Sequence, residues 1–187
     1  MASTKRDDIE RAALALFAER GFHGTSVPDL ADAAGVGAGT IYRHFDNKEG
    51  VVNALYQRWK VQLGQEVFES VPDDLPWRAR IRELWRALFL FNRNHPGALS
   101  FLDLHHHSGY LDAQSQQIEA QSAMAFFGLV AAAQAAEAIV DLPAPAIIAM
   151  VYSGFLGLIR AESEGYLELD DAMIDATFDR VWAMIRV

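Results

Sequence analysis

The segment from Val36 to Phe45 carries side chains whose types and spacing suit contacts with nucleic acid. Thr40, Arg43 and His44 supply a hydroxyl, a guanidinium and an imidazole, which are groups that bind phosphates and base edges. In a helix, positions separated by three or four residues share one face. These three side chains are therefore predicted to lie on the outer face of one short helix.

The other positions of this segment indicate how the helix would be held. Ile41 and Phe45 are four residues apart and form an apolar inner face. Tyr42 presents its hydroxyl end outward, and the glycines at positions 37 and 39 let another backbone approach closely because they have no side chain. We interpret the segment as the recognition helix of a helix-turn-helix.

Two helices with clear start and stop signals precede this segment. The spacing of apolar residues predicts a first helix over 5–20, which Gly21 ends. A second helix is predicted over 27–34, because Ser26 and Asp29 have the form of a capping box. Gly35 then begins a short turn, as expected between two crossing helices. A long fourth helix is predicted from Asn47 to about residue 70.

These motifs occur in an order that resembles a known family. Thr25-Ser26-Val27, Leu30-Ala31, Ala34-Gly35-Val36 and the run from Gly39 to Lys48 are similar to the DNA-binding domain of TetR-family transcriptional regulators. The resemblance implies an all-α homodimer that binds operator DNA through the third helix and a ligand through its C-terminal part. Gly37 departs from the pattern, because a capping serine is common there and glycine caps less firmly.

The resemblance also implies a set of DNA contacts. The predicted DNA-binding residues are Thr25, Ser26, Ala38, Thr40, Tyr42, Arg43, His44 and Lys48. Most of them are expected to contact phosphates, whereas Ala38, Thr40 and Arg43 are placed to read bases through a thymine methyl group or a guanine edge. Arg43 has the alternative of contacting phosphate only.

The charge of the chain limits how it could bind DNA. The formal net charge is −9, and the first fifty residues contain six Lys or Arg against eight Asp or Glu. A general nucleic-acid binder would have a basic face. Any affinity must therefore come from a few placed groups and from helix N-termini.

Composition predicts a soluble cytoplasmic protein. Hydrophobic residues make up 51% of the chain, charged residues 22%, and there is no cysteine to form disulfides. The N-terminal residues lack the apolar core of a signal peptide. The apolar segments 124–140 and 146–159 contain polar residues and glycines, so they are interpreted as buried helices and no membrane partner is expected.

The remainder of the chain is also predicted to be helical. Further helices are expected over 77–94, 99–104, 111–140 and 144–164, with a last one capped by Asp170, which gives an all-α fold of about nine helices. We predict a DNA-binding domain over residues 1–48, a linking helix over 47–70, and a ligand-binding and dimerisation domain over 49–187.

Aromatic residues at helical spacing suggest a pocket for a small apolar or aromatic ligand. The candidate lining residues are Trp59, Trp85, Phe89, Phe101, His105, Phe126, Phe127 and Tyr152. For any single residue the alternative is ordinary core packing. As a group, aromatic-rich helices around a bundle are how the similar family builds an apolar pocket.

The run His105-His106-His107 raises the question of a metal site or an enzyme. Adjacent helical residues point about 100° apart, so the three imidazoles cannot face one ion. Neither a metal nor another cofactor is therefore expected, and pocket lining or a surface loop are the alternatives. A small helical enzyme that uses Asp103 with these histidines is a rival, but no nucleophile–base spacing supports it. A second rival is an adaptor that keeps the fold but has no pocket.

The last two helices carry more apolar surface than one core needs. The predicted dimer-interface residues are Gly154, Gly157, Met173, Ile174, Thr177, Val181 and Met184. They would form a two-fold four-helix contact between copies, and the alternative is that they belong to the domain core.

Together with the resemblance, the sequence predicts a ligand-responsive homodimeric regulator, and specifically a repressor that binds a pseudo-palindromic operator.

Overall fold

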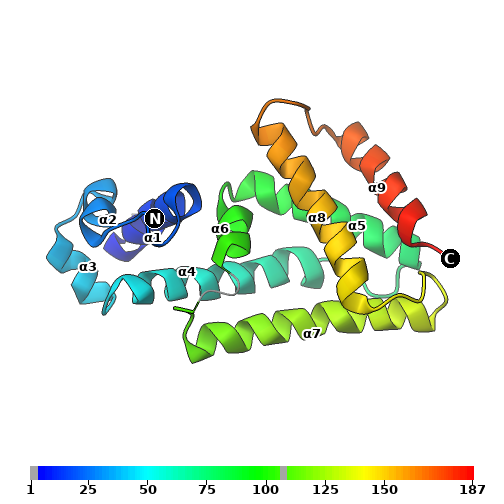
Figure 1. Ribbon diagram of the computed structural model, residues 1–187, viewed down its shortest axis with the longest axis horizontal. Helices are drawn as coiled ribbons and strands as arrows, with labels where there is room; N and C mark the ends of the chain where they lie inside the picture. Colours follow the sequence, from blue (N-terminus) through cyan, green and yellow to red (C-terminus); the bar gives the residue numbers. More distant parts are fainter. Residues whose placement is uncertain (1–3, 106–108) are drawn as a thin grey trace. The chain divides into compact units, whose positions relative to one another are not determined.

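The computed structural model describes residues 4–105 and 109–187, and these residues are almost entirely helical. The elements in chain order are α1 (Lys5–Arg20), α2 (Val27–Ala34), α3 (Ala38–His44), α4 (Lys48–Leu63), the π-helix η1 (Gly64–Glu69), α5 (Trp77–Asn94), α6 (Ala98–His105), α7 (Ala113–Ala135), α8 (Ala144–Ser163) and α9 (Asp171–Ile185) (Figure 1). Within the described ranges no strand forms, although Ile139 and Arg186 make an isolated bridge. The all-α prediction is confirmed.

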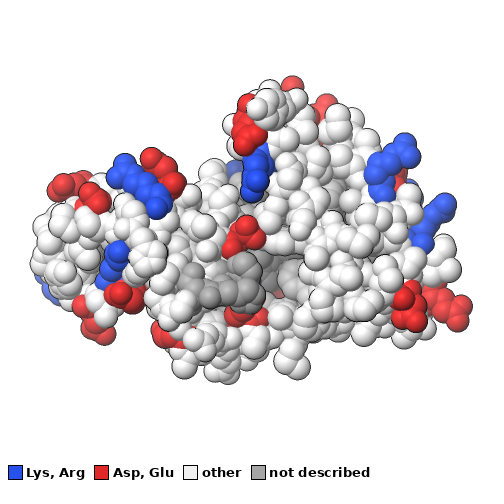
Figure 2. Space-filling view, in the orientation of Figure 1, with Lys and Arg blue, Asp and Glu red and all other residues white. Residues whose placement is uncertain are grey.

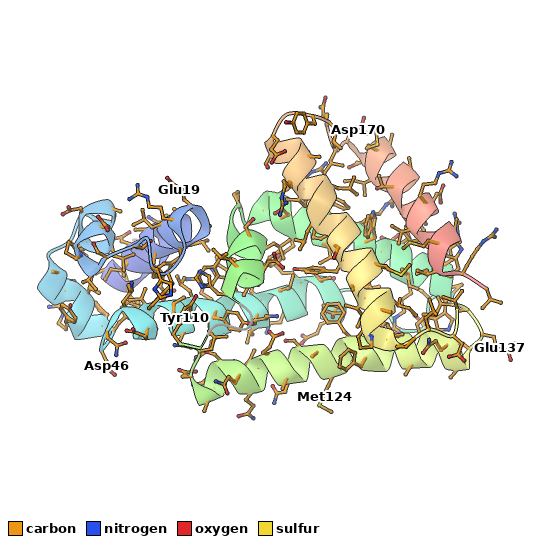
Figure 3. The ribbon with its side chains drawn as sticks, viewed as in Figure 1. Glu19, Asp46, Tyr110, Met124, Glu137 and Asp170 are labelled. Atoms are coloured by element: carbon orange, nitrogen blue, oxygen red, sulfur yellow. The ribbon has the colours of Figure 1, made fainter. Side chains whose placement is uncertain are left out.

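Helix boundaries follow the local signals where those signals are strong. The predicted ranges 5–20, 27–34 and 77–94 coincide with α1, α2 and α5. The predicted helix over 111–140 is too long, because α7 ends at Ala135. Glu137, labelled beyond the end of α7 in Figure 3, has a φ of 53°. This left-handed residue allows Ala138 N–H to bond back to Ala133 O, which closes the helix.

The chain is divided into two compact units. Unit 1 comprises Met1–Gln65 and Phe91–Ala120, and unit 2 comprises Glu66–Leu90 and Gln121–Val187. This division differs from a boundary after residue 48, because α1 packs against α4 and α6 as well as against α2 and α3. The three crossings between the units fall within η1, within α5 and within α7.

Unit 1 has an aromatic core around α1. Phe17 is fully buried, and its ring centroid lies 6.2 Å from that of Phe22 and 6.3 Å from that of Phe101. Phe22 in turn stacks on Tyr110 at 4.1 Å. Burial of a side chain of this size typically contributes about 1.5–3 kcal/mol. The packing therefore joins the helix-turn-helix to α6 in one core.

A buried polar cluster fixes α4 to the start of α7 within unit 1. Asn53 donates to the carbonyl oxygens of Glu49 at 2.8 Å and Tyr110 at 2.9 Å. Its own carbonyl oxygen accepts from the main-chain N–H of Asp112 at 2.9 Å and from the hydroxyl of Ser115 at 2.7 Å. The amide of Asn53 therefore has partners for both donors and its acceptor, as a buried amide requires.

Unit 2 packs η1, α5 and α7–α9 around an apolar centre. Val130, Ala133, Ile139, Ile147 and Ile185 form its buried cluster. Across the unit, the indole of Trp85 on α5 donates to the carbonyl oxygen of Ile174 on α9 at 3.2 Å. The guanidinium of Arg86 pairs with Asp175, and this pairing holds the pKa of the carboxyl group below its usual value. These contacts join α5 to α9.

The α8 helix is largely exposed in the protomer, so the prediction of a buried helix over 146–159 is wrong. In α8 only Ile147 and Phe155 are buried. Of the described helices, α8 alone has the length and apolar composition needed to cross a membrane, and 11% of its most apolar stretch is buried. Met124 on α7 is also 72% exposed (Figure 3). Segment 124–140 is therefore only partly buried, and the apolar surface of α8 is available to a partner.

Candidate nucleic-acid interface and apolar pocket

The start of α2 is fixed by reciprocal hydrogen bonds. Ser26 Oγ accepts from the main-chain N–H of Asp29 at 3.2 Å, and Asp29 Oδ2 accepts from the main-chain N–H of Ser26 at 2.8 Å. The hydrogen bonds from Ser26 also lower the pKa of the Asp29 carboxyl group. The predicted capping box is confirmed, and it places the positive end of α2 at the surface.

A glycine turn joins α2 to α3. Gly35 has a φ of 63° and a ψ of 37°, a left-handed conformation that favours glycine. The turn is closed by hydrogen bonds from Gly35 N–H to Asp32 O at 3.1 Å and from Val36 N–H to Ala31 O at 3.0 Å. Gly37 is the N-cap of α3 and makes no side-chain cap, so the helix begins at Ala38 and not at Val36.

The two faces of α3 differ as the sequence predicts. Ile41 is fully buried and Phe45 is 6% exposed, so both anchor the inner face. Tyr42 is 56% exposed, and Arg43 is also exposed. The helix is only seven residues long. Its orientation therefore depends on the two buried side chains and on the elements on either side.

Two further side chains of the outer face differ in how far they reach the surface. Ala38 is exposed and Thr40 is half-buried, with its main-chain N–H bonded to Gly37 O at 2.8 Å. His44 is half-buried, and its Nε2 is covered and has no hydrogen-bond partner within residues 4–105 and 109–187. Contact of His44 with a phosphate would therefore have to use Nδ1.

The predicted phosphate contact of the Thr25 side chain is wrong. Thr25 is 1% exposed, and its hydroxyl donates to the carbonyl oxygen of Gly21 at 3.0 Å. The hydroxyl thus satisfies the end of α1 and cannot reach a partner outside the protein. Ser26 remains exposed, but its hydroxyl is used in the capping box of α2.

Lys48 has an internal role that the sequence did not indicate. Its Nζ donates to the carbonyl oxygens of Phe22 at 2.8 Å and Thr25 at 2.9 Å. These hydrogen bonds tie the first turn of α4 to the α1–α2 turn. They use two of the three donors of the ammonium group, so the side chain that was predicted to contact phosphate is also an internal tie.

A buried carboxylate joins α1 to α4. Glu10 is 6% exposed and accepts from Arg6 at 2.8 Å and from Arg58 at 2.7 Å. The guanidinium of Arg6 also lies 4.7 Å from the ring centroid of Phe45. One buried acid therefore pairs with two cations, one from α1 and one from α4. On the face drawn in Figure 2, the two signs of charge are interspersed over α1–α3.

Unit 2 contains an apolar pocket with a cavity of about 110 Å³. Its walls come from η1, α5, α7, α8 and the C-terminal end of α9. The lining residues are Val67, Phe68, Ile81, Leu84, Trp85, Leu88, Phe126, Leu129, Val130, Ala133, Ile139, Ile147, Ile148, Val151, Tyr152, Phe155 and Ile185. The rings of Phe68 and Phe126 meet edge to face at 4.6 Å, so η1 packs directly against α7 at the pocket wall.

The residues predicted to line a pocket divide between this cavity and other parts of the structure. Trp85, Phe126 and Tyr152 line the cavity. Phe89 is 1% exposed and packs behind the wall, with its ring 4.9 Å from that of Phe155. Phe127 is 42% exposed, because it lies next to Phe126 on α7 and points away from the cavity.

Three other predicted lining residues belong to unit 1. Phe101 and His105 pack against Phe17 with ring centroids at 6.3 Å and 6.0 Å. Trp59 lines a separate cavity of about 480 Å³ beside Glu10, Arg58 and His95. Aromatic type alone could not separate these residues from the pocket, because both units have aromatic cores. The aliphatic lining residues were missed because the prediction selected residues by aromatic type.

Of the histidine run, the described part of the chain includes only His105. No group of three or more potential ligands gathers there. His105 is 1% exposed, and its Nδ1 shares a hydrogen bond with the hydroxyl of Tyr110. Burial lowers the pKa of His105, and a main-chain contact with Phe17 partly offsets this effect. His106 and His107 lie outside the described residues.

The predicted dimer residues divide into buried and exposed groups. Ile174 is 4% exposed and belongs to the core of unit 2, which corrects its assignment to an interface. Met173 and Met184 are 41% and 42% exposed. Gly154 and Gly157 are exposed, and a side-chain carbon at either position would meet no atom within 4 Å. Thr177 and Val181 are half-buried beside them.

The sequence matches two patterns that together cover nearly the whole chain. The pattern described as bacterial regulatory proteins of the tetR family matches residues 9–55. The pattern described as the C-terminal domain of tetracyclin repressor-like proteins matches residues 56–187. The first of these covers α1 from Ile9 onward, α2, α3 and the start of α4, and the second includes every residue of the apolar pocket.

Individual proteins give the same picture. The HTH-type transcriptional repressor KstR2 of Rhodococcus jostii is 39% identical over 82 residues, which are 44% of this chain and 40% of that protein. In such alignments the chain spans less than half the length of the curated relatives.

Solved structures resemble the fold over almost its full length. A TetR family transcription regulator from Marinobacter aquaeolei is 23% identical, with a TM-score of 0.84 over 97% of this chain and 95% of that one. The ketosteroid transcriptional regulator KstR2 of Mycobacterium tuberculosis is 20% identical, with a TM-score of 0.81 over 100% and 97%. At these identities the likeness concerns the fold alone.

Proposed function

The chain belongs to the tetR family of bacterial regulatory proteins, and we propose that it is a sequence-specific DNA-binding transcriptional repressor. It acts in the bacterial cytoplasm as a homodimer on a pseudo-palindromic operator. A small apolar ligand held in unit 2 controls its affinity for that operator. In this account the helices α1–α3 read DNA, and the remaining helices dimerise and bind the ligand.

The observation that carries the DNA-binding proposal is the two-sided construction of α3. Ile41 is fully buried whereas Tyr42 is 56% exposed, so a short helix is held by one face and offers the other. Lys48 fixes the first turn of α4, immediately after this helix, to the α1–α2 turn. The helices α1–α3 are therefore held in place before they meet DNA, which lowers the entropic cost of ordering them on binding.

The outer face of α3 divides into positioning and reading roles. Tyr42 contacts a phosphate, and His44 does so through Nδ1. Arg43 and Thr40 reach base edges, with Ala38 against a thymine methyl group. The first fifty residues contain six Lys or Arg against eight Asp or Glu, so non-specific affinity is weak. Two sets of α1–α3 helices, one from each copy of the chain, are then needed to bind an operator firmly.

The dimer forms through α8 and α9. The apolar surface of α8 is mostly exposed in the protomer, and it adjoins a shallow groove lined by Gly154, Leu158, Met173, Thr177 and Val181 among others. The glycines allow another helix to approach closely. A second copy of the chain covers this surface in a two-fold contact.

Ligand control runs through η1 and α4. Val67 and Phe68 of η1 line the pocket, and η1 follows α4 without a break at Gly64. A π-helix is uncommon in proteins and often marks a functional position, and η1 ends the helical run that α4 begins. A ligand that contacts η1 favours a different direction of α4. This changes the distance between the α3 helices of the two copies in the dimer. Differential affinity of the ligand for the two spacings supplies the control, and the ligand releases the operator.

A gel-shift experiment with two tyrosine variants tests the proposal. The probe is the DNA upstream of the protein's own reading frame, at low salt. Tyr42→Ala should abolish the specific complex, whereas Tyr166→Ala, which removes a tyrosine that is 79% exposed between α8 and α9, should leave it unchanged. Equal binding by both variants would contradict the assignment of α3.

A further inference from the structure

The apolar pocket of unit 2 contains almost no polar chemistry. None of its lining residues is charged, and among their side chains only Trp85 and Tyr152 carry a nitrogen or an oxygen. The Trp85 indole N–H already donates to the carbonyl oxygen of Ile174 at 3.2 Å. The lining therefore supplies no cation for an anionic group and no anion for a cationic one.

A charged ligand that entered this pocket would lose its hydration and meet no side chain of opposite charge. Burying an ionised carboxylate or ammonium group without a compensating charge is strongly unfavourable, and such a group either stays in water or loses its charge. An uncharged ring or branched hydrocarbon loses nothing of this kind and gains from contact with the aliphatic and aromatic walls.

The size of the cavity sets a second limit. Its volume is about 110 Å³. Apolar cavities of roughly 150 Å³ in proteins remain dry and take benzene-sized guests. Ile81 of α5, Ile139 after the end of α7, and Ile147 and Ile148 of α8 line the walls. They leave room for one compact guest rather than for a chain or a fused ring system.

We infer that the ligand of this pocket is a neutral, compact hydrocarbon-like molecule of about one substituted ring, and that small carboxylates and amines are excluded from it. This inference rests on the proposed function, since it names the class of ligand for the proposed regulatory pocket. It goes further by stating which charge and which size the pocket accepts.

Methyl NMR on the full-length protein without DNA tests the inference with three ligands of similar size. Toluene is neutral, benzoate is its anionic counterpart and benzylammonium its cationic one. With isoleucine methyl groups labelled, toluene should shift the signals of Ile81, Ile139, Ile147, Ile148 and Ile185, which line the pocket. The signals of Ile9 and Ile41, which are buried in unit 1, should not move. Benzoate and benzylammonium should bind about 100-fold more weakly or not at all.

A pair of alanine variants on α7 provides the matched control. Ala133 lines the pocket and is 1% exposed, whereas Ala131 is exposed and does not line it. Ala133→Leu should remove the toluene response and Ala131→Leu should retain it. If Ala133→Leu does not fold, Val151→Phe fills the same cavity from a half-buried position and should give the same loss.

The outcomes separate this inference from the proposed function. Benzoate that shifts the five pocket signals as strongly as toluene would overturn the charge limit, and a tight response to a fused-ring hydrocarbon such as phenanthrene would overturn the size limit. No response to toluene would overturn the inference as a whole. A toluene response with unchanged operator binding would leave the ligand class intact and contradict only the regulatory role.

Discussion

The ammonium group of Lys48 donates a hydrogen bond to the carbonyl oxygen of Phe22 at 2.8 Å and lies 3.9 Å from the centroid of the same residue's ring. One side chain thus binds both the backbone and the aromatic face of a residue that precedes the helix-turn-helix. Because Lys48 is the first residue of α4, this contact fixes the start of α4 relative to α1 and α2.

Replacing Lys48 with methionine should destabilise the protein. The variant keeps an apolar stem but loses two charge-assisted hydrogen bonds, so the free energy of unfolding should fall by about 1–3 kcal/mol. Urea denaturation measures this change. Lys5→Met is the control, because Lys5 is exposed at the start of α1 and its loss should cost less than about 0.5 kcal/mol. Equal stability of the two variants would mean that the Lys48 contacts contribute nothing.

His105 should make the protein less stable as the pH falls below about 6.5. Burial lowers the pKa of His105 in the folded protein beneath its usual value of about 6.5, so the unfolded chain binds the proton more readily. Stability is then fully present above pH 6.5 and is lost as the pH falls from there toward the folded pKa. The slope for this one group cannot exceed about 1.4 kcal/mol per pH unit.

The variant His105→Asn isolates this contribution. Unfolding free energies measured between about pH 5.5 and 7.5 should depend less on pH than those of the parent protein. His23→Asn, which replaces an exposed imidazole, should leave the pH dependence unchanged. A His105→Asn protein with the parental slope would assign the dependence to other groups.

The exposed methionines of α7 and α9 allow a test of the dimer. Met184 on α9 is 42% exposed beside the proposed interface, and Met124 on α7 is 72% exposed away from it. Met184→Glu should yield a folded monomer, because each copy would bury an unpaired carboxylate in the interface. Met124→Glu should remain a dimer. Light scattering with size exclusion at micromolar concentration measures both, and a dimeric Met184→Glu would contradict the interface.

The helix-turn-helix was predictable because its signals are local. Ser26 with Asp29, and Gly35 with its positive φ, act within a few residues of their position in the chain. The same holds for the capped start of α1. Where the signal is weak the prediction was wrong, as in the alanine-rich end of α7, which gives no stop residue before Glu137.

The pocket and the internal role of Lys48 were not predictable from the sequence. Which aromatic residue lines a cavity depends on the unit to which its helix belongs, and Trp59 and Trp85 have the same residue type in different units. The acceptors of Lys48 are main-chain carbonyls 26 and 23 residues away, and no pattern of side chains marks them. The sequence also does not indicate the π-helix η1, because its residues continue the helical pattern of α4.

Selection of binding sites from a pool of duplex DNA with a randomised core tests whether a homodimer of this protein recognises an operator. The enriched sequences should align to an inverted repeat, with half-sites about 34–36 Å or one helical turn apart, and Tyr42→Ala should enrich nothing. Enrichment of no common sequence, or of a single unrepeated half-site by the parent protein, would contradict a homodimeric operator-binding regulator.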